Sequence, residues 1–168
     1  MSQQTVWVYG DGNSARVMAY LPELVDPSVW EIVDLTFPTS NPAGDPGRPE
    51  DLAERFLVDA AQNPLPDVVW IGYAASGWSL LTIALGKYRE HYSAREADAI
   101  LRAADVMEST GIGTVLLSRG PGCPDTDDEC TRLGARAHQV VWQRTRKSGL
   151  PHIDWSLPRT DPTYWDLD

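Results

Sequence analysis

Short apolar segments alternate with longer amphipathic segments along the sequence, and this alternation limits the folds open to the chain. The apolar segments have the length and composition of buried strands, and they cover residues 6–9, 30–35, 67–73, 114–118 and 152–155. The segments between them place apolar residues at helical spacing over residues 50–62, 79–92, 94–110 and 127–147. Strict strand–helix alternation predicts βαβ units, a parallel sheet and right-handed crossovers.

The expected fold class is therefore α/β, a three-layer sandwich with about five parallel strands in the flavodoxin-like order 2-1-3-4-5. A chain of 168 residues suits one domain with its own core, so we expect residues 1–168 to form a single domain. Ligands of such sheets bind in a crevice at the carboxyl ends of the strands, where the strand order reverses. The first strand lies at that point in this order.

The turn after the first strand is rich in glycine and in small polar residues. It reads Gly10-Asp11-Gly12-Asn13-Ser14. Glycine tolerates the backbone angles of a sharp strand-to-helix turn, and Asn13 or Ser14 can cap the helix that follows. That helix is predicted from four apolar residues on one face, Val17, Leu21, Leu24 and Val25.

Candidate ligand contacts follow the first, third and fourth strands, whose carboxyl ends meet at this crevice. They are Asp11, Gly12, Asn13, Ser14, Ser76, Trp78 and Arg119. Ser14 is the best placed hydroxyl, Asp11 lies beside it, and Asn13 could donate an amide hydrogen to an oxyanion. Arg119 could hold a carboxylate or phosphate, and Trp78 could wall an apolar pocket. Each also has a structural alternative: a helix cap for Ser14 or Asn13, turn closure for Asp11 and a surface ion pair for Arg119.

The chain is acidic, with a formal net charge of −10. This charge argues against a nucleic-acid partner and against a polybasic membrane contact. No apolar run approaches the ~20 residues of a membrane span, and the first residues lack the features of a secretory signal. We therefore expect a cytoplasmic protein whose partner is a small-molecule ligand or substrate, with the oligomeric state left open.

Cys123 and Cys130 are separated by six residues, a spacing that does not match a CxxC metal or redox pair. No second Cys/His pair lies nearby, so zinc is not expected. A disulfide that closes the loop between them is geometrically possible, but a cytosolic setting favours two thiols. We expect neither a metal nor a cofactor.

No histidine is well placed to act as a base in the crevice. His91 and His138 lie on predicted helices, and His152 begins the fifth strand, at the end opposite a carboxyl-end site. If Ser14 serves as a nucleophile, Asp11 or a residue of a neighbouring subunit would have to activate it.

The sequence resembles the SGNH/GDSL hydrolases, a large family of esterases, lipases and acyl-transferring relatives. The likeness rests on Val8-Tyr9-Gly10-Asp11 after the first strand, on residues 66–72 (PDVVWIG), and on a long helix that leads into residues 113–117 (GTVLL). The resemblance implies a five-stranded parallel sheet between helices. It also implies hydrolysis or acyl transfer on an ester of a small molecule.

The chain departs from the family pattern at the catalytic residues. Gly12 stands where the family has its nucleophilic serine. The family completes its oxyanion hole with a glycine, here Gly44 or Gly47, and with an asparagine, which residues 72–77 (GYAASG) lack. Asp166 or Asp168 could begin the family's Asp-x-x-His, whose histidine would lie beyond Asp168.

Two functions of different classes remain open. The first is an ester hydrolase or acyltransferase with an atypical catalytic set that includes Ser14 and Asp11. The second is a catalytically divergent protein of the same fold that binds a small molecule or runs a non-hydrolytic reaction in the same crevice. The expected oxyanion or ligand contacts are the same for both: Gly12, Asn13, Gly44, Ser76, Trp78 and Arg119.

Overall fold

The computed structural model describes residues 3–10, 14, 18, 20–36, 51–72, 82–83, 85–118 and 128–154. Its five strands are β1 (Gln4–Gly10), β2 (Trp30–Asp34), β3 (Val68–Gly72), β4 (Gly113–Ser118) and β5 (His152–Asp154). They form one sheet in the order β2-β1-β3-β4-β5, and each of the four pairings is parallel. The predicted α/β class, strand order and internal position of the first strand are confirmed.

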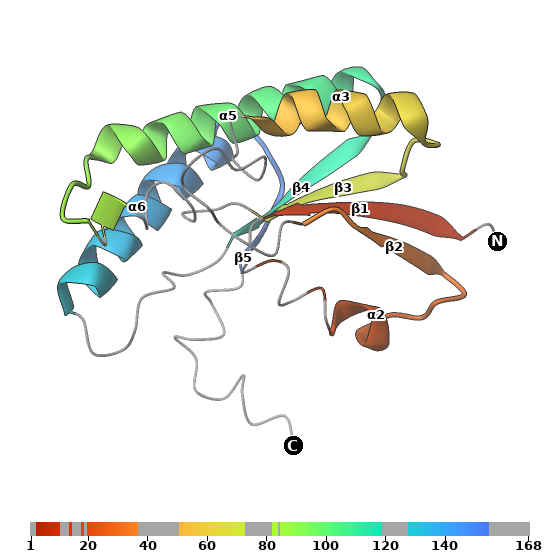
Figure 1. The fold of residues 1–168 in the computed structure, drawn as a ribbon, viewed down its shortest axis with the longest axis horizontal. Helices are drawn as coiled ribbons and strands as arrows, with labels where there is room; N and C mark the ends of the chain where they lie inside the picture. Colours follow the sequence, from red (N-terminus) through yellow and green to blue (C-terminus); the bar gives the residue numbers. More distant parts are fainter. Residues whose placement is uncertain are drawn as a thin grey trace.

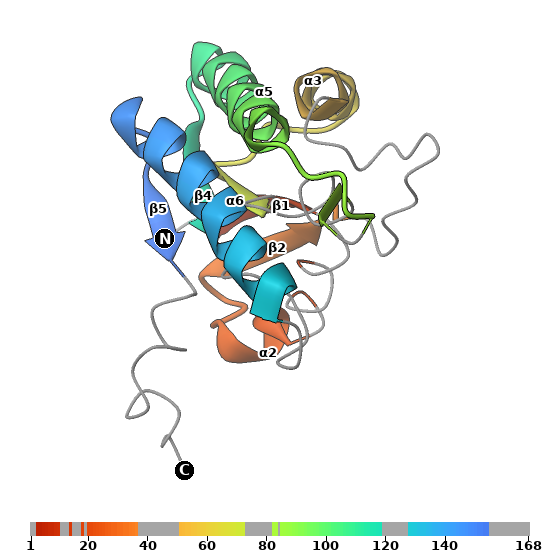
Figure 2. The same ribbon diagram turned by 90° about the vertical axis from the view of Figure 1, so that its left-hand side faces the viewer.

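Helices cover both faces of the sheet (Figures 1 and 2). On one face lie α3 (Leu52–Gln62) and α5 (Glu90–Ser109), with α6 (Asp128–Lys147) packed along α5. The short helix α2 (Leu21–Leu24) lies on the other face. The three layers follow from this arrangement, because an internal parallel strand must bury both of its faces.

Strand β1 shows this double burial in its alternating side chains. Trp7 and Tyr9 pack into the larger core beneath α3 and α5, and Val6 and Val8 pack against Met18 on the other face. All four strand residues are at most 3% exposed. A near-continuous apolar run is the expected sequence of such a strand.

The helix expected after β1 is interrupted, which corrects the prediction of one continuous apolar face. Ser14 and Met18 are helical, but the chain turns at Tyr20 and a new helix begins at Leu21. Pro22 explains the break, because a proline inside a helix clashes with the carbonyl four residues earlier, here that of Met18. As a result Leu24, expected on the inner face, is 80% exposed.

The boundary between the third and fourth predicted helices also differs from the prediction. Residues 82–83 are helical, but the chain then turns at Gly86, whose φ is +64°, and α5 begins at Glu90 instead of residue 94. A left-handed glycine is a frequent helix terminator. The predicted end of α5 is confirmed, because Gly111 follows it with a φ of +85°.

Candidate functional site

Ser14 lies at the carboxyl ends of β1 and β3. Gly10 and Gly72 are the last residues of these two strands and pair with each other in the sheet. The hydroxyl of Ser14 donates a hydrogen bond to the carbonyl oxygen of Gly72, with the two oxygens 2.7 Å apart. A Cβ on either glycine would overlap the side chain of Ser14. The serine therefore fills a space that only glycine leaves open at both strand ends.

In this geometry the Ser14 hydroxyl is a hydrogen-bond donor. A carbonyl oxygen can only accept, so the proton points to Gly72, and the remaining lone pairs of the hydroxyl can accept from other donors. A serine nucleophile needs its proton directed to a base that removes it during attack. The arrangement of Ser14 is that of a group that joins two strand ends and the following helix.

The other residues predicted for the site fall outside the part of the chain that the structure describes. They are Asp11, Gly12, Asn13, Gly44, Gly47, Ser76, Trp78 and Arg119. The same holds for Cys123, Asp166 and Asp168. Ser14 lies at the predicted edge of the sheet, and the remaining contacts of the crevice stay predictions.

A second polar group near this edge was not singled out in the sequence. Tyr9, the residue before Gly10, is fully buried, and its hydroxyl donates to a carboxylate oxygen of Asp59 at 2.7 Å. The guanidinium of Arg55 lies 5.3 Å from the centre of the Tyr9 ring and donates to the carbonyl of Leu35, directly after β2, at 2.9 Å. The spacing of Arg55 and Asp59, four residues apart on α3, is the signal that places both on one helix face.

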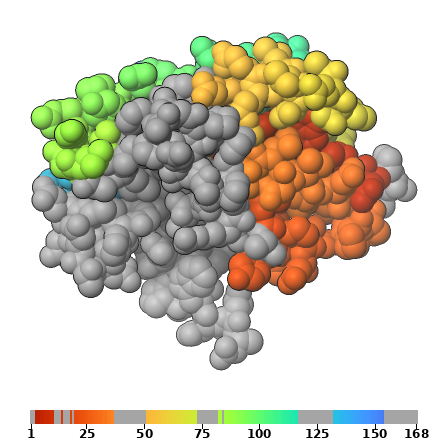
Figure 3. Space-filling model, viewed as in Figure 1, coloured from red at the N-terminus to blue at the C-terminus, as the bar shows by residue number. Residues whose placement is uncertain are grey.

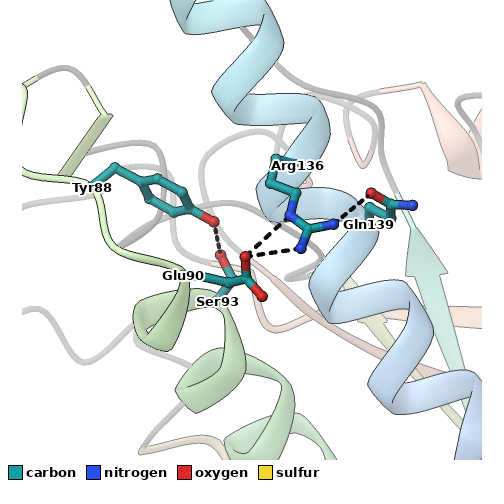
Figure 4. Close-up of polar contacts among 5 residues, drawn as sticks. All are labelled: Tyr88, Glu90, Ser93, Arg136 and Gln139. Atoms are coloured by element: carbon teal, nitrogen blue, oxygen red, sulfur yellow. Dashed lines mark hydrogen bonds and ion pairs between the residues drawn. The ribbon is translucent and has the colours of Figure 1, made fainter.

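A third polar group lies at the amino end of α5 and joins it to α6 (Figure 4). The hydroxyl oxygens of Tyr88 and Ser93 are 3.0 Å apart. Arg136 donates twice to one carboxylate oxygen of Glu90, at 3.0 and 3.1 Å, and once to the side-chain oxygen of Gln139. Because α5 runs antiparallel to the strands, this group also lies toward their carboxyl ends.

The pKa of Tyr88 is raised above its ordinary value. Burial is the main cause, and the negative charges of Glu90 and Glu96 add to it, whereas the hydrogen bond with Ser93 and the charge of Arg136 act in the opposite direction. The phenol therefore stays protonated near neutral pH and keeps its capacity to donate a hydrogen bond.

His152 lies closer to the carboxyl edge than the sequence analysis expected. It begins β5, but β5 pairs with the carboxyl half of β4, so His152 is level with Leu116 and, through β3, with Ile71. Its ring is turned toward α6, where Nε2 is 2.8 Å from the hydroxyl of Thr145, and Nδ1 is 2.7 Å from the carbonyl of Leu150. Both ring nitrogens thus have partners within the chain.

Two properties of the described residues bear on ligands and membranes. Within these ranges no group of three or more His, Cys, Asp or Glu side chains is placed to hold a metal ion. In the same part of the chain no helix is long and apolar enough to cross a bilayer.

The sequence matches no family model and no curated protein. The structure, however, is similar to solved esterases over most of its length. Esterase EstA from Pseudoalteromonas sp. is 11% identical, with 99% of this chain and 86% of that one covered and a TM-score of 0.59. A variant of the acetyl xylan esterase Axe2 from Geobacillus stearothermophilus is 17% identical, with coverages of 91% and 77% and a TM-score of 0.59. A GDSL-like lipase from Bacteroides thetaiotaomicron is 13% identical, with coverages of 92% and 70% and a TM-score of 0.53.

These similarities define the class of fold. The chain has the α/β fold of the SGNH/GDSL hydrolases, as the sequence resemblance implied. Further structures of Axe2, with an aspartate or a histidine replaced, are described as those of catalytic mutants. Identities below 20% carry the fold and not the activity.

Proposed function

We propose that this chain is an SGNH-fold protein that binds a small molecule at the carboxyl ends of β1, β3 and β4, and that Ser14 does not hydrolyse esters there. The observation that carries the proposal is the position of Ser14. Its hydroxyl donates to the carbonyl of Gly72, and its side chain occupies the space above Gly10 and Gly72. The serine stabilises the rim of the crevice.

The chemistry of ester hydrolysis supports this reading. A serine hydrolase needs a nucleophile, a base within hydrogen-bond reach of it, and donors for the oxyanion. Gly12, which follows the Gly-Asp pair, has no side chain to attack with. Residues 72–77 contain no asparagine to donate to the oxyanion, and one lost donor typically costs about 10²–10³ in rate.

A second candidate is an ester hydrolase or acyltransferase with a rearranged set that includes Ser14 and Asp11. It is favoured by the similarity to esterases over at least 91% of this chain in the three structures above. Acetyl esters are the substrate class that the name of one of these enzymes suggests. Before it could attack, Ser14 would have to give up its bond to Gly72 and leave the space between the strand ends.

Both candidates act on a small molecule in the crevice, and we further propose a cytoplasmic location and a single domain over residues 1–168. The net charge of −10 supports the choice of a small-molecule partner over a nucleic acid.

Turnover of p-nitrophenyl acetate by the purified protein separates the two candidates. We expect no turnover above buffer by the wild type or by Ser14→Ala, and partial activity in Gly12→Ser, which restores a nucleophile after the Gly-Asp pair. Ser148→Ala, a substitution of an exposed serine after α6, is the matched control. Robust wild-type turnover that Ser14→Ala abolishes and Ser148→Ala preserves would refute the first candidate and establish the second.

Binding is tested on the same proteins by thermal unfolding in the presence of p-nitrophenyl acetate. A ligand that binds only the native state raises the melting temperature in a concentration-dependent way. We expect such a rise for the wild type. Unchanged melting temperatures up to the solubility limit of the ester would contradict an ester-binding crevice.

A further inference from the structure

The surface formed by α2 and the start of β2 exposes several large apolar side chains. Tyr20, Leu24, Val29 and Trp30 are 67%, 80%, 43% and 36% exposed. These four fall within eleven consecutive residues, the densest such group in the described ranges. Exposed apolar residues are unremarkable singly, but a local concentration is typical of an interaction site.

Acidic residues stand between these apolar residues in the chain. Residues 20–36 contain four acidic residues, Glu23, Asp26, Glu31 and Asp34, and no lysine or arginine. The pKa of Asp26 is held below its ordinary value, chiefly by hydrogen bonds from the side chain and backbone of Ser28. We call Tyr20, Leu24, Val29 and Trp30, together with Glu23 and Asp26, the acidic-apolar surface.

The backbone beneath the acidic-apolar surface is held in place by hydrogen bonds. The amides of Val29 and Trp30 both donate to the carbonyl of Asp26 at 3.0 Å. The amide of Gln4, the first residue of β1, donates to the carbonyl of Val29 at 2.8 Å, and the side chain of Gln3 donates to Pro27. A surface that is already ordered loses less conformational entropy when a partner binds.

The start of β2, which carries Trp30, lies at the edge of the sheet opposite the crevice. Trp30 pairs with Gln4 at the amino ends of β2 and β1, whereas Ser14 lies at the carboxyl ends of β1 and β3. In Figures 1 and 3 the orange segment that contains α2 and β2 lies at the surface, along the lower right of the molecule. A macromolecule bound there would leave the carboxyl ends of the strands accessible.

We propose that the acidic-apolar surface docks a partner protein through a segment that presents apolar side chains flanked by lysine or arginine. The apolar contacts supply the affinity, and the carboxylates steer and orient the basic segment. A second copy of the chain fits less well, because its net charge of −10 opposes contact with the carboxylates of Glu23 and Asp26.

The probe for this proposal is a fluorescein-labelled synthetic helical peptide of leucine and lysine, with a leucine–glutamate peptide of the same pattern as reference. Fluorescence anisotropy measures their binding to the wild type. We expect the lysine peptide to bind, the glutamate peptide not to bind, and added salt to weaken the complex. The double variant Tyr20→Ser with Leu24→Ser should bind at least about tenfold more weakly, as expected when anchor side chains are lost. The matched control is the double variant Leu57→Ser with Val58→Ser on α3, where these side chains are 51% and 55% exposed. It should bind the peptide like the wild type.

A second pair of variants tests the charges. Glu23→Gln with Asp26→Asn should weaken binding and its salt dependence more than the control Asp51→Asn with Asp105→Asn, which removes the same charge elsewhere. Circular dichroism confirms that each variant is folded. The proposal is overturned if the lysine peptide does not bind, or if control and test variants lose the same affinity. It is also overturned if sedimentation shows a wild-type dimer that the apolar double variant abolishes, because the surface then serves a second copy.

Discussion

Replacing Gly72 by alanine tests whether Ser14 fills the space above the ends of β1 and β3. A methyl group on Gly72 would overlap the hydroxyl oxygen of Ser14 and would lie 3.0 Å from its Cβ. The serine would have to move and would lose its hydrogen bond to the Gly72 carbonyl. Overpacking and the lost hydrogen bond together should lower the free energy of unfolding by about 2–4 kcal/mol.

Ser14→Ala separates the two contributions. Alone, it removes the hydrogen bond and should cost about 1 kcal/mol. In the Ser14→Ala background the oxygen that Gly72→Ala would strike is gone, and only the close contact with the Cβ remains. Gly72→Ala should then cost only about 1 kcal/mol, so the two substitutions are strongly non-additive.

Gly10→Ala is the matched comparison. A methyl group on Gly10 would overlap the Cβ of Ser14 as well as lying 2.5 Å from its hydroxyl oxygen. Ser14→Ala keeps that Cβ and should therefore not rescue Gly10→Ala.

Urea unfolding followed by tryptophan fluorescence and circular dichroism gives the free energies for this double-mutant cycle. If the losses in free energy of unfolding caused by Gly72→Ala and Ser14→Ala add within about 0.5 kcal/mol, the usual result for independent sites, Ser14 does not fill the space above Gly72. Ser14→Ala should lower the cost of Gly72→Ala but not that of Gly10→Ala. If it lowers both costs equally, the two methyl groups do not strike different atoms of Ser14.

Three further predictions concern groups outside the crevice. Tyr9→Phe leaves the half-buried carboxylate of Asp59 without its 2.7 Å donor and should cost about 1–3 kcal/mol in urea unfolding; a loss below ~0.3 kcal/mol would show that this bond is not formed. Arg144→Gln breaks an ion pair with Asp98 whose side chains are 47% and 57% exposed, and should change stability by less than about 1 kcal/mol; a larger loss would mean that the pair is more shielded than it appears. Tyr88 has a raised pKa, so its contribution to stability is complete below the ordinary tyrosine pKa and is lost as the pH rises through the folded value. Absorbance titration should show a late-titrating phenol that Tyr88→Phe removes, and a titration curve unchanged by this substitution would contradict the expectation.

The fold could be predicted from the sequence because its determinants are local. Each strand is a short apolar run bounded by glycine, proline or polar residues, and the observed bounds differ from the predicted ones by two residues at most. Strand–helix alternation then leaves few topologies, since parallel connections are right-handed. The apolar spacing alone predicts a continuous helix through Tyr20, and the break there follows from Pro22, which interrupts that helix.

The role of Ser14 could not be predicted, because it depends on a contact between residues far apart in the chain. The partner of its hydroxyl is Gly72, 58 residues away. In the sequence, both a helix cap and a nucleophile are consistent with a serine two positions after Gly12. Only the pairing of Gly10 with Gly72 shows that two missing side chains create the space which the serine fills. Tyr9 and Asp59, 50 residues apart, illustrate the same limit.

The most direct test of the account is the reactivity of Ser14 toward a fluorophosphonate, which forms a covalent adduct with activated serine nucleophiles. The purified protein is treated with the probe, and intact mass and peptide mapping locate any adduct. Because the proton of Ser14 is donated to the Gly72 carbonyl, we predict that Ser14 stays unmodified in the wild type, and that Gly12→Ser becomes labelled at the new serine. Stoichiometric labelling of Ser14 in the wild type, absent in Ser14→Ala, would contradict the account and identify Ser14 as a nucleophile.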